Sequence, residues 1–136
     1  MDLRELMVDS KSVWVDFPGM PGFSVEVANL SKQELNKLRK SCVTQKFDRK
    51  TRTVAETLDE ERFVERFTEK TVKNWKGLTL DYLQNLLLID TEGKDMREEL
   101  EYSQANAVAL VTNSVEFDEW LNEVVFDLEN FRSGRD

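Results

Sequence analysis

The chain has 136 residues, of which 40% are hydrophobic, and its 27 acidic and 19 basic side chains give a net charge of -8. This length is enough for one domain with its own core, and three well-separated tryptophans exclude a chain that is disordered throughout. The acidic charge argues against nonspecific nucleic-acid binding as the main role. A single cysteine excludes an intrachain disulfide and fits a reducing compartment.

Charge is distributed unevenly along the chain. Eight basic and two acidic residues lie between Lys32 and Arg52, a net charge of +6, whereas thirteen acidic and four basic residues follow from Asp90 onward, a net charge of -9. Such a dipolar chain can orient a partner or pair head to tail with a copy of itself. The simpler interpretation is that the blocks are solvent-facing surfaces that differ in sign.

The sequence carries no signal for export or membrane insertion. The N-terminus lacks the basic start and apolar run of a signal peptide. The longest dense apolar run, residues 86–89, is far shorter than the ~20 residues that a membrane span needs. We therefore expect a cytoplasmic protein with no membrane partner.

The first predicted element is a β-hairpin over residues 12–28, preceded by a flexible end at residues 1–11. Residues 13–17 and 23–27 are rich in β-forming side chains, and the Pro-Gly-Met-Pro-Gly segment between them predicts a chain reversal. Met20 at the tip of this rigid loop is expected to be exposed. A bare methionine there suggests a contact point for a partner.

A capping box formed by Ser31 and Glu34 predicts a helix that runs to about Cys42. Cys42 falls on the apolar stripe of this helix, so we expect a small core residue instead of a nucleophile. Residues 43–58 have β character around a polar centre. A second hairpin and an extended loop both fit this segment.

Helix signals dominate the next part of the chain. Asp59 is expected to cap a helix whose apolar stripe reaches Trp75 and which Gly77 ends in a left-handed conformation. Thr79 is expected to begin a shorter helix, and Ser103 another. A polar loop at residues 90–95 separates the two.

The last helix is predicted from Asn113 or Ser114 to Phe131, followed by a flexible end at residues 132–136. Its apolar stripe is first of all a core face. The stripe covers more than half of the circumference, however, and such a helix must bury two sides, either inside the domain or at an interface. Together with Met20, the candidate protein-binding residues are therefore Phe117, Trp120, Val125 and Phe126.

These elements predict a single α+β domain over residues 1–136 that is mostly helical. Its N-terminal β-hairpin is expected to pack on about four to five helices, which occupy most of residues 31–131. The helices must cover one face of the hairpin, because a lone hairpin is only marginally stable in water.

No catalytic or metal-binding machinery is recognisable in the sequence. The chain has no histidine, which excludes imidazole acid–base chemistry, histidine-based triads and the common zinc sites. A calcium loop beginning at Asp90 fails in detail, because Gly93 is its fourth residue and an EF-hand needs glycine at the sixth. We therefore predict a protein that is not an enzyme, uses no cofactor or metal, and binds other proteins.

Taken in order, several segments resemble tail assembly chaperones of long-tailed, siphovirus-type bacteriophages. The most suggestive are the Trp-Lys-Gly-Leu stretch after a charged helix and the Asn-Phe pair that follows the acidic last helix. The resemblance extends over about residues 13–131 and is carried by residues 14–23, 35–40, 46–52, 72–78 and Phe131.

This resemblance implies a specific role. Such chaperones bind the tape measure protein, a long helical molecule that sets tail length, and help to recruit tail tube subunits. They act in the host cytoplasm, use no cofactor and are absent from the mature virion. Two alternatives stay open: a structural head–tail connector or tail completion protein of the virion, and a small nucleic-acid-binding regulator that acts through the segment between Lys32 and Arg52.

Overall fold

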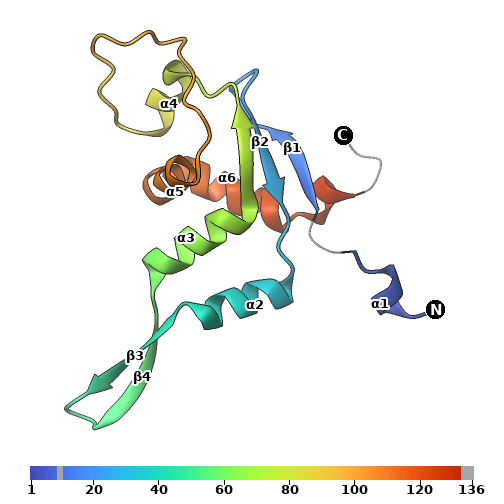
Figure 1. Ribbon diagram of the computed structural model, residues 1–136, viewed down its shortest axis with the longest axis vertical. Helices are drawn as coiled ribbons and strands as arrows, with labels where there is room; N and C mark the ends of the chain where they lie inside the picture. The colour runs from blue at the N-terminus through green and yellow to red at the C-terminus, as the bar shows by residue number, and fades with distance from the viewer. Residues whose placement is uncertain (9–10, 133–136) are drawn as a thin grey trace.

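The computed structural model describes residues 1–8 and 11–132, and Figure 1 shows how its elements are arranged. The mostly helical α+β fold that the sequence predicts is confirmed. No helix of the described residues combines the length and the apolar character that crossing a bilayer requires. In chain order the elements are α1 (Leu3–Leu6), β1 (Ser12–Asp16), β2 (Ser24–Ala28), α2 (Lys32–Ser41), β3 (Val43–Asp48), β4 (Thr53–Leu58), α3 (Glu60–Thr71), β5 (Val72–Lys76), α4 (Leu80–Leu86), α5 (Gln104–Asn113), α6 (Val115–Phe126) and the 3-10 helix η1 (Leu128–Phe131).

The centre of the fold is a three-stranded antiparallel sheet in the order β1-β2-β5. The predicted hairpin at residues 12–28 is confirmed, because β1 and β2 pair along their whole length. β2 has a strand on each edge and helices α3 and α6 in contact with it, so almost all of its side chains are buried. The hairpin is therefore part of a larger sheet and not a separate two-stranded unit.

The largest departure from the prediction lies at residues 72–76. The apolar stripe of the sequence predicted one helix from Asp59 to Trp75, but α3 ends at Thr71 and strand β5 follows directly. Paired with β1 alone, β2 would leave the backbone donors and acceptors of its other edge unpaired. β5 fills that edge, with Trp75 opposite Val25. The segment 31–131 is thus less helical than expected, because pairing with β2 outweighs the helical preference of this short stretch.

Gly77 adopts the predicted left-handed conformation, with φ of 78°, but it ends a strand and not a helix. A Cβ at this position would collide with the carbonyl oxygen of Gly22 in the hairpin turn. Two residues later Thr79 caps α4, as predicted, and its side chain accepts a hydrogen bond from the backbone N–H of Tyr82. Gly77 therefore lets the chain turn tightly against the hairpin before α4 begins.

The predicted capping box begins α2: the Ser31 side chain accepts from the backbone N–H of Glu34 at 3.1 Å, and Glu34 reaches back to Ser31. Cys42, just after the helix, is fully buried, which confirms it as a core residue. Of the two alternatives for residues 43–58, the structure has the hairpin: β3 and β4 pair antiparallel. We call residues 43–58 the arm; in Figure 1 it extends away from the sheet, between α2 and α3.

An aromatic cluster joins the hairpin to α6. The ring of Phe17 lies 4.9 Å from that of Trp120, 6.0 Å from that of Phe117 and 5.4 Å from that of Phe23, measured between centroids. Buried aromatic pairs of this kind add about 0.5–1.5 kcal/mol each to the gain from burial itself. Much of the apolar stripe of α6 is thus used to cover the sheet.

The last helix is shorter than predicted. It begins after Ser114, whose side chain accepts from the backbone N–H of Phe117 at 3.1 Å, and it ends at Phe126. The Asp127 carboxylate then accepts from the backbone N–H of Glu129 at 3.0 Å and begins η1. A carboxylate that competes for nearby backbone donors favours such a break.

The predicted flexible ends are only partly described by the structure. Within residues 1–11, α1 forms a short helix with no buried residue, capped by the Asp2 side chain. Residues 9–10 and 133–136 lie outside the described part of the chain.

Candidate protein-binding surfaces

The structure separates the five candidate residues into four that are buried and one that is exposed. Met20, Phe117, Trp120 and Val125 belong to the core, whereas the side chain of Phe126 is 44% exposed. The breadth of the apolar stripe on α6 is explained largely by burial against the sheet and the neighbouring helices. Of the sequence candidates, Phe126 alone is available to a partner.

The expected exposure of Met20 is wrong, and the hairpin turn shows why. The Met20 carbonyl accepts from the backbone N–H of Phe23 at 3.0 Å, and the Phe17 N–H donates to the carbonyl of Phe23 at 2.9 Å. The hydroxyl of Tyr82 donates to the carbonyl of Pro21 at 2.6 Å and ties the turn to α4. The turn is folded onto the body, so Met20 is buried in the core.

A surface that the sequence only partly indicated runs along the outer side of α6 and into η1. Positions 115, 119, 122 and 126 follow helical spacing and are all exposed. Leu128, at the start of η1, is exposed as well. Phe126 is anchored by Phe67, whose ring lies 6.2 Å away. We define the α6 surface as the exposed apolar residues Val115, Phe126 and Leu128 with the exposed carboxylates Glu116, Glu119 and Glu123.

The α6 surface is strongly acidic. Residues 115–131 hold six acidic side chains and no basic one. Burial raises the pKa of Asp118, although the side chain of Asn122 donates a hydrogen bond to its carboxylate and counteracts this, and the nearby Glu119 raises the pKa further. Glu129 forms an ion pair with Arg132, and the other carboxylates leave a surplus of negative charge. Such a surplus beside exposed apolar side chains favours a partner that carries basic residues next to an apolar stripe.

The arm is the second exposed surface. Every residue from 44 to 58 is exposed, including Phe47 at 62% and Val54 at 60%. These two side chains are opposite each other in the register of β3 and β4. The sequence showed the β character of this segment, but only the structure shows that no other element of the described residues covers it.

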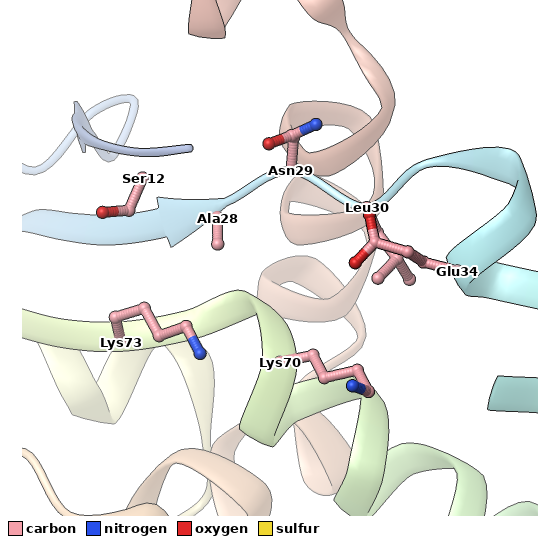
Figure 2. Close-up of a pocket in the computed structure, with 7 residues that line it drawn as sticks. All are labelled: Ser12, Ala28, Asn29, Leu30, Glu34, Lys70 and Lys73. Carbon is pink, nitrogen blue, oxygen red and sulfur yellow. The ribbon is translucent and has the colours of Figure 1, made fainter. Parts of the chain in front are cut away.

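Metal-binding side chains do not come together in the described ranges 1–8 and 11–132. No group of three or more cysteine, aspartate or glutamate side chains in those ranges is arranged to hold a metal ion. Figure 2 shows a pocket between the end of β2, the start of α2 and the junction of α3 with β5. Its charged groups are Glu34, Lys70 and Lys73, and the Lys73 ammonium donates to the Glu69 carbonyl at 3.2 Å. The pocket therefore offers lysines near one carboxylate, and Ser12 at its edge donates from its hydroxyl to the Glu26 carboxylate at 3.3 Å.

Comparisons with known proteins do not identify a family: no family model matches the sequence, and neither a curated protein nor a solved structure is significantly similar to it.

Proposed function

We propose that this chain is a tail assembly chaperone that binds the tape measure protein, and that it is not an enzyme. The observation that carries the proposal is Phe126, a half-exposed aromatic ring held in place by Phe67 at the edge of the core. Exposed aromatic side chains fixed in one orientation are favoured anchors for partner binding, because little conformational entropy is lost on association. The segments that resemble phage tail chaperones support the same role.

The α6 surface suits an elongated helical client. Val115 lies at the start of α6, Phe126 lies at its end and Leu128 follows in η1, so exposed apolar groups stand at both ends of the helix with polar side chains between them. A client helix with an apolar stripe can pack along such a face through several anchors. The flanking carboxylates keep the free chaperone soluble and favour clients with basic flanks.

The mechanism that follows is coating and release. Many copies cover the apolar stripe of the client, each with moderate affinity, and keep it soluble in the host cytoplasm. Tail tube subunits recruited to the complex displace the copies as the tube grows, so the protein is not retained in the virion. This sequence of events needs no chemical step and no cofactor.

The test is co-expression of the full chain with the tape measure protein of the same phage, followed by affinity capture. Phe126→Ser combined with Leu128→Ser should reduce the captured tape measure protein about tenfold, because both apolar anchors are lost. Leu3→Ser with Leu6→Ser is the matched control, since it removes two exposed leucines from α1 instead. Equal capture by both double variants would contradict the assignment of the α6 surface.

A second measurement separates the chaperone from the virion-component alternative. Mass spectrometry of purified particles should find the tape measure and tube proteins but not this chain. If the chain were present in stoichiometric amounts, a connector or tail completion protein would replace the chaperone as the better assignment.

A further inference from the structure

The arm is a two-stranded sheet that no other element in the described part of the chain covers. A lone hairpin of this size is marginally stable in water, and exposed strand edges favour pairing with another chain. The register shows that Val43, Phe47, Val54 and Leu58 share one face of the arm, with a polar pair between them. This apolar face is open to solvent along most of its length, so it has the properties of a docking element.

The arm and the neighbouring helix α2 are positively charged. Residues 32–58 hold eight basic and three acidic side chains, a net charge of +5. The four basic side chains of the arm form no ion pair with any other residue in the described ranges; they are Lys46, Arg49, Lys50 and Arg52. The occupant of the apolar face should therefore be acidic.

The opposite end of the same molecule provides such a surface. Figure 1 shows the arm at one end of the long axis and α4 with the loop that follows it at the other. Residues 81–101, which we call the acidic end, hold seven acidic and two basic side chains, a net charge of -5. Leu88, two residues after the end of α4, is fully exposed there. The acidic end thus combines an apolar contact with surplus carboxylates, as the arm combines apolar contacts with surplus cations.

We propose that copies of this chain associate head to tail, with the arm of one copy docked on the acidic end of the next. Phe47 and Val54 pack against Leu88, and the basic side chains of the arm face the carboxylates of the acidic end. A single copy cannot make this contact with itself, because the two surfaces lie at opposite ends of the molecule. Both halves of the interface are present on every copy, so the second copy is the occupant that the charges specify.

The geometry of this contact has a consequence for assembly. It joins two different surfaces and is therefore heterologous, so each copy binds two neighbours and the copies form open rows or rings. The α6 surface is not used in the contact and stays available in every copy. The association does not depend on the identity of the client, and its test contains no client, so its failure is distinguishable from failure of the proposed function.

The test is sedimentation velocity of the full chain between about 10 and 500 µM protein, at low and high salt. The average mass should rise with protein concentration in 50 mM NaCl and fall towards that of the monomer in 500 mM NaCl, because salt screens exposed charges. A monomer at every concentration in low salt would overturn the proposal.

Two neutralised variants identify the surfaces. The arm variant carries Phe47→Ser, Arg49→Gln and Lys50→Gln, and the acidic-end variant carries Leu88→Ser, Glu98→Gln and Glu99→Gln. All six side chains are exposed, so circular dichroism should show folded chains. Each variant alone should associate about tenfold more weakly than the wild type, since two rim charges and an apolar contact are lost together.

A mixture of the two variants is the decisive sample. One intact arm and one intact acidic end remain between them, so the mixture should form a 1:1 dimer that grows no further. Absence of that dimer would overturn the head-to-tail contact. Glu119→Gln with Glu123→Gln is a control on the α6 surface and should associate like the wild type; loss of association there would overturn the acidic end as the acceptor.

The same variants test the competing occupant. Three results together would overturn the proposal and make the arm a nucleic-acid contact. The wild type would be retained on duplex DNA at about 150 mM salt, the arm variant would not be retained, and the wild type would sediment as a monomer.

Discussion

Substitution of Gly77 by alanine tests the tight contact between the hairpin turn and the start of α4. Two costs add at this position. The left-handed φ of 78° costs about 1 kcal/mol for any residue with a Cβ, and the added methyl group collides with the carbonyl oxygen of Gly22. Because backbone atoms and not a flexible side chain must move, the collision should add about 1–3 kcal/mol. We expect Gly77→Ala to destabilise the fold by about 2–4 kcal/mol in total.

Gly93→Ala provides the matched control for this experiment. Gly93 has nearly the same conformation, with φ of 75°, but a Cβ there meets nothing within 4 Å. Its substitution should therefore show only the conformational cost of about 1 kcal/mol. The difference between the two variants isolates the collision with Gly22.

The assay is urea unfolding followed by tryptophan fluorescence, with the free energy of unfolding obtained by linear extrapolation. Trp75 is buried next to this region and reports its loss. If Gly77→Ala were no more than about 0.5 kcal/mol less stable than Gly93→Ala, the close approach of Gly77 to the hairpin turn would be refuted, because a real collision must exceed that difference.

Two further predictions concern single side-chain hydrogen bonds. Tyr102→Phe removes the bond from the hydroxyl to the Val72 carbonyl at 2.8 Å and should cost about 1 kcal/mol at pH 7. Burial, and then the charge of Glu26, raise the pKa of Tyr102, so the stability contributed by the protonated hydroxyl is complete below its ordinary pKa of 10.0 and is lost as the pH rises through the raised pKa. The difference between wild type and Tyr102→Phe in urea unfolding should accordingly shrink above about pH 10, and a constant difference up to pH 11 would contradict this. Ser114→Ala removes the N-cap of α6, where the side chain accepts from the Phe117 N–H, and should cost about 1–2 kcal/mol; a thermal melt unchanged within 1 °C would show that water replaces the cap.

Several features of the fold could be predicted because their signals are local. Ser31, Asp59, Thr79 and Ser103 were all expected to begin helices, and each side chain accepts from a backbone N–H three residues later. The Pro-Gly-Met-Pro-Gly segment restricts the backbone to a reversal between two strands. In all these cases the interacting groups are so close in the sequence that the rest of the molecule hardly affects them.

The candidate binding residues could be predicted only in part. Helical spacing placed Phe117, Trp120 and Phe126 on one helix, but spacing gives the direction of a side chain and not what lies in front of it. The hairpin, through Phe17, covers the first two, and the third is left half exposed at the end of α6. Val115 and Leu128 had the same apolar character in the sequence, and their exposure depends on where the neighbouring elements end.

By itself, the sequence determined the helix starts, the hairpin turn, the helix-rich α+β class and the uneven charge. The tertiary structure alone decided that residues 72–76 form a strand, that Met20 is buried, and that the arm and the acidic end lie far apart. The physical reason is distance along the chain. β5 exists because residues 24–27 offer it hydrogen-bonding partners, and burial depends on which distant elements pack nearby, so neither can be read from a local pattern.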